Sequence, residues 1–344
     1  MQTILNTLYI TVPNAYVHLE NDTVRVDIER EKKLQVPLHH LSGVVCYGHT
    51  LISAGLMQRL ADDGKSLVLL DASGRFKARL EGSVSGNILL RQAQFRLADD
   101  PIRSLEIARA CLAGKVKNAR FVILRGARDA KDLADRQTLE AVARHLAASL
   151  RGLVYATSAD QLRGVEGDAA AHYFSCFNLL IRADYRADFC FNGRTRRPPR
   201  DRVNALLSFL YSMLMNDCRS ALEIVGLDAQ LGFLHAVRPG RAALGLDLME
   251  EFRAIVVDRL VLTLINRGQI RATDFDEREG GAVSMRDEAR RAVIVAYQER
   301  KQELFAHPLL TQQVPLGLLP VLQARLLARA VRGEIIGYLP YLMK

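Results

Sequence analysis

Acidic and imidazole side chains that could hold a divalent cation gather between residues 226 and 253. His235 follows an apolar stretch, and Pro239-Gly240 then interrupts the chain before a helix is expected to begin near Arg241. On that helix Asp247 and Glu250 are three residues apart, so their carboxylates share one face. Oxygen ligands with a single nitrogen ligand suit Mn²⁺ or Mg²⁺ better than Zn²⁺. The alternative is that the carboxylates complement the helix dipole and that the histidine is structural.

A further carboxylate, Glu166, lies on an expected helix between Gly164 and Gly167. Glycines cost helix stability, so their presence on both sides of an acidic residue needs a reason. They would let another backbone or a DNA strand come close to the carboxylate. A simply solvated glutamate is the alternative interpretation.

Arginines are dense in the stretch 194–202, where five occur in nine residues. Pro198 and Pro199 are expected to keep this strip extended, because the residue before a proline avoids the helical region. An extended strip of arginines can follow phosphates with bidentate contacts, although a solvated loop would also have this composition. The residues predicted to bind DNA are Arg194, Arg196, Arg197 and Arg200, with Lys115, Arg238 and Arg241 widening the basic surface.

The elements that must position these residues fall into two groups. Before residue 80 the apolar residues alternate as in strands, with a short helix over 53–62, and from residue 89 onward they follow a helical period. Strands are expected near 8–12, 24–29, 34–38, 44–46, 67–70 and 76–80, and helices over 102–119, 134–150, 158–181, 202–222, 242–267, 286–304 and 318–332. The glycine- and serine-rich stretch 82–86 marks the change of character. The sequence thus predicts an α+β protein: a β-rich domain over 1–85, a linker over 86–92, and a large all-α catalytic and DNA-binding domain over 93–344.

The charge of the chain is distributed unevenly. The formal net charge is +9 and the pI is about 9.5, while residues 1–90 carry nine basic and nine acidic residues, so the whole excess of basic residues follows residue 90. This balance favours an anionic partner, nucleic acid before membrane.

Several classes of protein are disfavoured by what the sequence lacks. The five cysteines are widely spaced without a C-x-x-C pair, which argues against a disulfide framework and a structural zinc site. The phosphate-binding, dinucleotide-binding, H-E-x-x-H and G-x-S-x-G motifs are all missing. Because no run of about 18 apolar residues occurs, we expect no membrane span and a cytoplasmic location.

Five segments, in order and at matching spacing, resemble the CRISPR-associated integrase, the first-numbered Cas protein family of spacer acquisition. They are GVEG with the following Tyr-Phe (164–174), NGRTRRPPRDRVNALLSFLYSML (192–214), GLDAQLGFLH (226–235), LGLDLMEEFR with VVD (244–258) and VLQARLLARAVRG (321–333). The resemblance covers essentially the whole chain and is greatest to the form found with type I-C systems. It implies an N-terminal β domain followed by a helical domain.

The resemblance also implies the site and the chemistry. The metal ligands would be Glu166, His235 and Glu250, with Asp247 as a further catalytic residue whose role stays open: it could support the metal, orient His235 or orient the nucleophile. Many family members have Asp where this chain has Glu250. The implied reaction is metal-dependent attack of a protospacer 3′-hydroxyl on repeat phosphodiesters, and hydrolysis when water is the nucleophile. The cofactor would be Mn²⁺ or Mg²⁺.

The implied partners are double-stranded and branched DNA, a second copy of this chain, and a small second-numbered Cas protein. Joining both ends of one fragment requires two active sites, so we expect a homodimer, with the neutral β domain as its interface. A dimer of the small Cas protein would bridge two such dimers. The alternatives are a non-catalytic scaffold for branched DNA and a general junction-repair nuclease.

Overall fold

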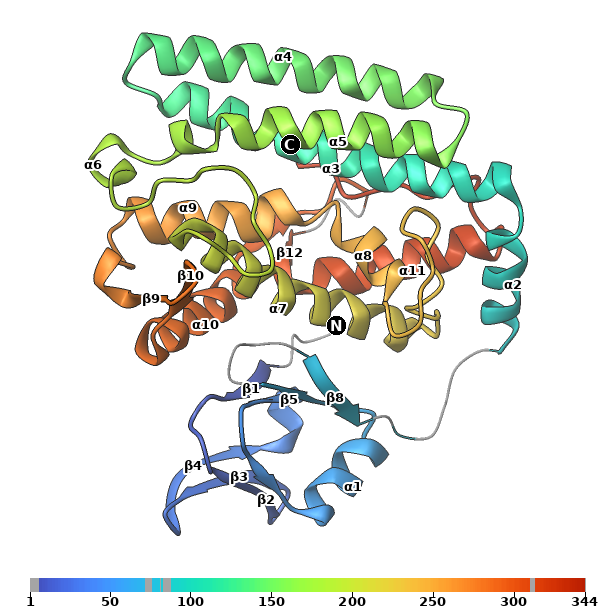
Figure 1. Cartoon of the computed structure of the whole chain (residues 1–344). Helices are drawn as coiled ribbons and strands as arrows, with labels where there is room; N and C mark the ends of the chain where they lie inside the picture. The colour runs from blue at the N-terminus through green and yellow to red at the C-terminus, as the bar shows by residue number, and fades with distance from the viewer. Residues whose placement is uncertain (1–5, 72–75, 81, 83–87, 310–312, 344) are drawn as a thin grey trace. The chain divides into compact units, whose positions relative to one another are not determined.

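The computed structural model describes residues 6–71, 76–80, 82, 88–309 and 313–343, which form two compact units (Figure 1). Unit 1 consists of Met1–Ser85 together with Arg290–Gln302, and unit 2 of Gly86–Ala289 together with Glu303–Lys344. Residues 290–302, which the sequence analysis assigned to the helical domain, therefore belong with the β-rich unit. Residues 83–87, at the expected change of character and the start of the expected linker, lie outside the described residues.

Unit 1 contains two four-stranded sheets and a helix. In the first sheet β1 (Asn6–Ile10), β5 (Leu41–Tyr47) and β7 (Ser66–Leu70) run parallel, and β8 (Phe76–Leu80) is antiparallel to β7. The second sheet has the order β4-β3-β2-β6, with bounds Glu31–Pro37, Thr23–Ile28, Tyr16–Glu20 and Leu51–Ile52. Helix α1 (Ala54–Asp62) begins where the Ser53 hydroxyl accepts a hydrogen bond from the Leu56 N–H. The predicted strands and helix are present, whereas β2 and the short β6 were not predicted.

The core of unit 1 forms from the inward-facing residues of these strands and α1. Its buried members include Val17, Val24, Val44, Leu56 and Leu60. The alternation that predicted the strands is thus the alternation between this core and solvent.

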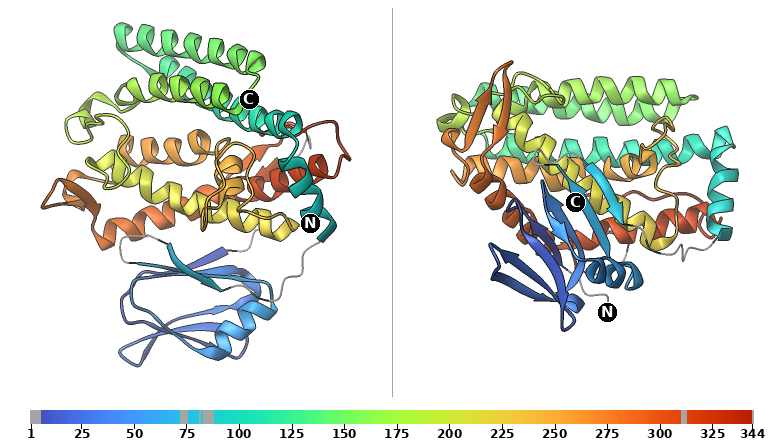
Figure 2. Two further views of the ribbon diagram at one scale, coloured as in Figure 1. Left: turned by 45° about the vertical axis from the view of Figure 1, so that its right-hand side comes forward. Right: turned by 60° about the horizontal axis from the view of Figure 1, so that its bottom comes forward.

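Unit 2 is mostly helical, and α3, α4 and α5 lie side by side in every view (Figures 1 and 2). Long helices are possible here because each buries an apolar stripe against its neighbours and because aspartate or serine caps their starts: Asp100, Asp132, Ser158 and Asp201 accept backbone N–H bonds. The helices are α2 (Ile88–Ala98), α3 (Pro101–Asp129), α4 (Leu133–Tyr155), α5 (Ala159–Ser175), α6 (Ala183–Arg186), α7 (Arg202–Val225), α8 (Ala243–Met249), α9 (Arg259–Asn266) and α11 (Leu319–Val331). Helix α10 (Asp287–Gln302) begins in unit 2, and its residues from Arg290 onward belong to unit 1.

Three expectations about this part of the chain are corrected. Residues 88–92 are not linker, because they begin α2, in which Leu90 and Leu97 are buried. Unit 2 is not all-α, because β9 (Phe275–Arg278) pairs with β10 (Ala282–Met285) and β11 (Leu304–Ala306) pairs with β12 (Gln313–Pro315). The expected helix over 242–267 is interrupted after α8 and continues as a π-helical turn, η3 (Arg253–Asp258), before α9.

Among the described residues, no helix has both the length and the apolar character needed to cross a membrane.

Candidate active site

His235 is oriented by Asp247, which lies fully buried on α8. Asp247 accepts backbone N–H bonds from Phe233, Leu234 and His235 at 2.6, 3.0 and 3.0 Å. Its Oδ1 also lies 2.6 Å from Nδ1 of the His235 ring. An acceptor-only carboxylate at Nδ1 places the ring proton there, which leaves the lone pair of Nε2 available. Asp247 therefore fixes both the tautomer and the direction of the ring.

The loop that carries His235 packs tightly against α8. A Cβ built on Gly232 would lie 2.7 Å from the backbone carbon of Ala243 and 2.8 Å from Oδ2 of Asp247. Only glycine fits at this approach, because a side chain would have to displace backbone. The interruption at Pro239-Gly240, where Gly240 has a φ of +72°, lets the chain turn from this loop into α8.

Glu250 follows the last residue of α8 and is only 3% exposed, yet its carboxylate faces two positively charged side chains. Its Oε1 lies 3.0 Å from Nη2 of Arg253, and its Oε2 lies 2.8 Å from Nζ of Lys115. Burial alone would raise the pKa of Glu250, but Arg253 and Lys115, with His235, outweigh it and lower the pKa to about 2. Glu250 is therefore a carboxylate, and its Oε1 lies 3.7 Å from Nε2 of His235.

Glu166 of α5 joins the same group through Lys115 of α3. The Lys115 ammonium ion-pairs with Oε1 of Glu166 and also with Glu250, so it lies between the two carboxylates. The Glu166 side chain keeps 29% of its surface exposed, which leaves it accessible from solvent. The fold thus brings together all four residues that the sequence predicted to be catalytic.

This group fits a divalent cation. Glu250 faces Lys115 through one carboxylate oxygen and Nε2 of His235 through the other, and Lys115 also pairs with Glu166, so the group already holds one positive charge. The donor set is rich in oxygen, as Mn²⁺ and Mg²⁺ prefer. Asp247 supplies the hydrogen-bonded carboxylate that usually stands behind a metal-binding histidine.

Two residues predicted to bind DNA have structural partners in the described residues. Lys115 is held by Glu166 and Glu250. Arg194 donates to the Thr195 carbonyl, to Asn204 Oδ1 and to Ser208 Oγ, and its guanidinium lies over the Tyr211 ring. Arg194 therefore anchors its own loop to α7, and its guanidinium is not free to follow a phosphate.

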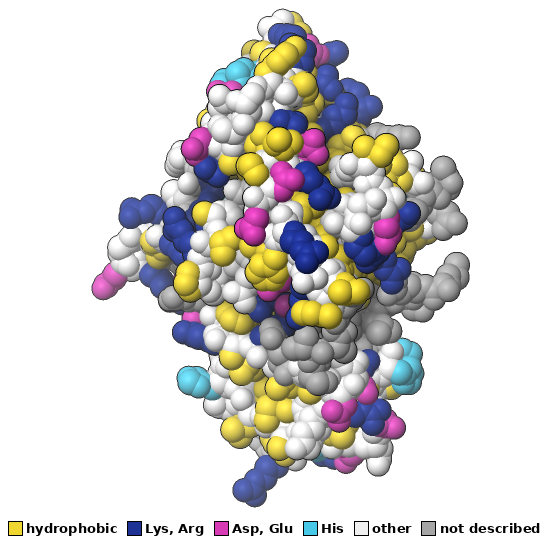
Figure 3. All heavy atoms as spheres, turned by 90° about the vertical axis from the view of Figure 1, so that its right-hand side faces the viewer, with side chains coloured by type: hydrophobic (Ala, Val, Ile, Leu, Met, Phe, Trp, Pro, Cys, Tyr) yellow, Lys and Arg dark blue, Asp and Glu magenta, His cyan; other side chains and the backbone are white. Residues whose placement is uncertain are grey.

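The remaining predicted DNA-binding residues are accessible. Arg196, Arg197, Arg200 and Arg238 are exposed, and Arg241 is half-buried. Arg196 also lines a cavity of about 50 Å³ together with Lys115, Glu166 and Arg253. The strip is not extended throughout, however, because it bends at Arg197-Pro198, where the peptide bond is cis. On the face drawn in Figure 3, Lys and Arg side chains of the described residues lie interspersed with acidic and apolar ones.

Arg253, which neutralises Glu250 from three residues further along the chain, was not predicted from the sequence. The i, i+3 spacing between them is the signal that could have identified it. The buried carboxyl of Asp258, which accepts hydrogen bonds from the hydroxyls of Tyr173 and Tyr211 at 2.9 and 2.6 Å, was not predicted either. No pattern in the sequence links three residues so far apart.

Glu251, the neighbour of Glu250, is turned away from this site. It is fully buried and accepts hydrogen bonds from the Tyr338 hydroxyl, the Tyr341 N–H and the Gln323 amide. Glu251 therefore ties the C-terminal segment to the helical core.

We expect Asp247→Asn to lower both the affinity for the metal and the stability of the fold. The amide would present N–H groups to backbone donors, and leaving such donors unpaired costs about 1–3 kcal/mol. Losing the carboxylate behind His235 should raise the Mn²⁺ concentration for half-maximal activity about 10–100-fold. A Mn²⁺ titration of nuclease activity measures this, and an unchanged midpoint would contradict the orienting role.

We also expect Asp258 to make stability fall with rising pH. Burial raises its pKa to about 6, despite the hydrogen bonds from Tyr211 and Tyr173. The folded carboxyl holds its proton more tightly than the unfolded one, so this contribution is complete below about pH 4 and is lost as the pH rises through about 6. The difference in free energy of unfolding between Asp258→Asn and wild type should shift by about 2 kcal/mol in favour of the variant when the pH is raised from 4.5 to 7.5. Urea unfolding at both values tests this, and an equal gap at both would contradict it.

Known proteins are similar to this chain in sequence and in fold. The family model described as CRISPR associated protein Cas1 matches residues 8–299. The chain is 51% identical over 344 residues to CRISPR-associated endonuclease Cas1 1 of Moorella thermoacetica, covering 100% of both chains. It is 47% identical over 340 residues to CRISPR-associated endonuclease Cas1 1 of Chlorobaculum tepidum, covering 99% of both.

Solved structures agree in fold. A CAS1 protein from Thermotoga maritima superposes with a TM-score of 0.81 at 22% identity, over 96% of this chain and 99% of that one. A casposase bound to integration product superposes with a TM-score of 0.84 at 20% identity, over 99% of this chain and 95% of that one. From its full-length relatives and the family match, this chain belongs to the CRISPR associated protein Cas1 family and is a CRISPR-associated endonuclease.

Proposed function

We propose that this chain is the integrase of CRISPR adaptation and that Glu166, His235, Glu250 and Asp247 form its active site. The observation that carries the proposal is that Glu250 lies beside Nε2 of His235 and shares the Lys115 ammonium with Glu166. Glu166, His235 and Glu250 would hold Mn²⁺ or Mg²⁺. When bound, that ion would act as a Lewis acid on a DNA phosphodiester.

The protein residues have separate tasks in this reaction. Asp247 keeps the proton on Nδ1 of His235, so that Nε2 offers its lone pair. Lys115 pairs with both Glu166 and Glu250 and would hold these two carboxylates close together. The 3′-hydroxyl of the incoming strand attacks the phosphorus, one P–O bond forms and one breaks, and a new 3′-hydroxyl leaves. With water as nucleophile the same site cleaves DNA.

The proposed partners are double-stranded and branched DNA, a second copy of this chain and a Cas2 dimer. Two solved relatives of this fold support them by their titles: a TtCas1–DNA complex, with a TM-score of 0.54, and a Cas6-RT-Cas1–Cas2 complex, with a TM-score of 0.82 over 36% of that chain. We propose that DNA runs over Arg196, Arg197, Arg200, Arg238 and Arg241, that unit 1 dimerises, and that the Cas2 dimer bridges two dimers. The type I-C subtype remains part of this proposal.

The test uses a labelled half-integrated DNA with the purified protein and either Mn²⁺ or Mg²⁺, and it measures binding and turnover separately. Wild type should cleave or rejoin the branch only with metal. Substitution of both Arg196 and Arg197 by Ala should weaken DNA binding, while His235→Ala should bind normally and turn over no DNA. Binding without turnover by wild type with either metal would support the scaffold alternative, and normal turnover by His235→Ala would overturn the role of His235.

A further inference from the structure

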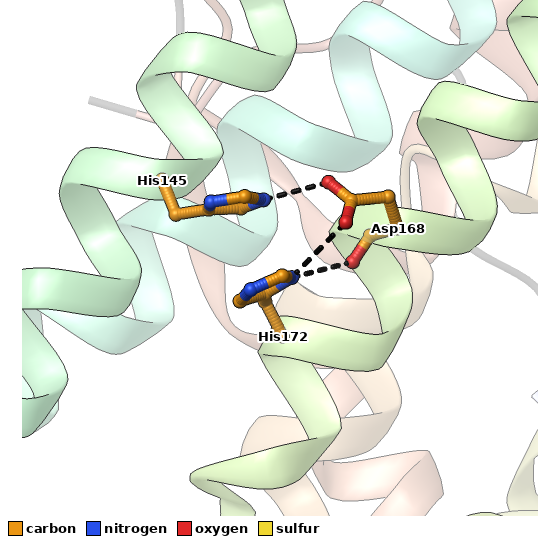
Figure 4. Close-up of side chains that lie close together, drawn as sticks. All are labelled: His145, Asp168 and His172. Atoms are coloured by element: carbon orange, nitrogen blue, oxygen red, sulfur yellow. Dashed lines mark hydrogen bonds and ion pairs between the residues drawn. The ribbon is translucent and has the colours of Figure 1, made fainter.

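A second group of metal-binding residue types lies on the other side of helix α5. Asp168 and His172 are four residues apart on α5, so they lie one turn from each other on one face, and His145 of α4 faces them across the helix pair (Figure 4). Each residue offers one ligand atom, and these atoms all lie within 4.8 Å of one another. None of the three belongs to the site around Glu166.

The contacts within this group show how closely the ligand atoms converge. Nε2 of His145 lies 2.6 Å from Oδ2 of Asp168, and Nδ1 of His172 lies 3.0 Å from the backbone carbonyl oxygen of Asp168 and 3.4 Å from Oδ1 of its carboxylate. The two imidazole rings stack with their centroids 3.5 Å apart and 18° between their planes. The carboxylate therefore lies against the nitrogens of both rings, as Figure 4 shows.

The group is also open enough for a hydrated ion. The side chains of His145, Asp168 and His172 are 36%, 52% and 42% exposed. In the part of the chain that the structure describes, the ion pairs of these three residues are with one another. An incoming cation would therefore meet one carboxylate and two imidazoles without displacing a lysine or arginine from them. Water would complete the coordination.

The position of the group on α5 separates it from the proposed active site. Glu166 precedes Asp168 by two residues, which is more than half a helical turn, so the two side chains leave α5 in nearly opposite directions. Glu166 faces Lys115 of α3, whereas Asp168 faces His145 of α4. An ion held by Asp168 and His145 would tie α4 to the helix that carries Glu166.

We propose that His145, Asp168 and His172 bind a divalent cation that prefers imidazole, with Zn²⁺ as the best fit, and that this ion clamps α4 to α5. Two imidazole nitrogens with one carboxylate oxygen are a donor set that Zn²⁺ takes with water in the remaining position. Mg²⁺, which prefers oxygen ligands, fits this set poorly. Each ring binds through a nitrogen lone pair, so a proton on that nitrogen is released to solvent on binding.

The test is a titration of Zn²⁺ alone into chelator-treated protein without DNA. At a free concentration about 100 times the Kd, Zn²⁺ should raise the Tm of wild type by about 5 °C. His145→Ala and His172→Ala, which alter exposed side chains, should lose this shift and bind one Zn²⁺ fewer per chain. His39→Ala, an exposed histidine in unit 1, is the matched control and should behave as wild type.

Two further variants separate this site from the one around Glu166. Glu166→Gln and His235→Ala should keep the Zn²⁺-dependent Tm shift, whether or not they retain nuclease activity. Co²⁺ added in place of Zn²⁺ should give a visible absorption band that is lost in His145→Ala. The proposal is overturned if wild type shows no shift, if the shift persists in both His145→Ala and His172→Ala, or if Glu166→Gln and His235→Ala abolish it.

Discussion

Glu166→Gln is expected to lower cleavage and strand transfer at least about 1000-fold without loss of stability. The substitution keeps the size of the side chain but removes the charge that pairs with Lys115. Stability should hold because Lys115 keeps Glu250 as its partner, so the substitution leaves no buried charge unpaired. Single-turnover rates with Mn²⁺, beside thermal unfolding of the same preparations, measure both effects.

The matched control for Glu166 is Glu140→Gln on α4. The Glu140 side chain is 39% exposed and pairs with Arg136 one helical turn away, so its substitution removes the same charge from a pair that does not include Lys115. This variant should keep wild-type rates. If Glu166→Gln cleaved branched DNA as fast as Glu140→Gln, the assignment of Glu166 as a ligand would be wrong.

The elements of the fold were largely predictable because their signals are local. The alternation in Val24–Glu29 marks a strand of a sheet with one buried face, and the apolar period of residues 202–222 marks α7. The missed hairpin between β9 and β10 also had a local signal. Gly280 and Gly281 both adopt positive φ at its turn, as a tight hairpin requires, but they lie among charged residues that mask the short strands.

The candidate site was predictable in its membership but not in its connections. Residue types and family resemblance predicted Glu166, His235, Asp247 and Glu250, and the fold places each of them beside another of the group or beside Lys115. The sequence could not reveal that Lys115, which was predicted to bind DNA, instead neutralises Glu166 and Glu250. Ion pairs between residues on different helices, here 51 or more positions apart, leave no periodic pattern in the sequence. It also left the role of Asp247 open, because the bonds that define this role come from the backbone of a loop.

Glu250→Ala is expected to destabilise the protein by about 3 kcal/mol, unlike Glu166→Gln. Glu250 is 3% exposed and pairs with Arg253, whose side chain is 17% exposed, so removing the carboxylate leaves a largely buried guanidinium without this partner. The low pKa of Glu250, about 2, has the same origin, because it reports how strongly the folded site favours the anion. Urea unfolding at pH 7 measures the loss.

A double-mutant cycle separates the lost pair from the cavity that alanine leaves. Arg253→Met removes the guanidinium but keeps an apolar stem, so Glu250→Ala in that background should cost markedly less than in wild type. If Glu250→Ala lowered the free energy of unfolding equally in wild type and in Arg253→Met, the packing of Glu250 and not its charge would stabilise the fold here. A coupling of about 1–3 kcal/mol would instead mean that Glu250 is held as an anion by the fold before any metal arrives, which is the pre-organisation that a cation site requires.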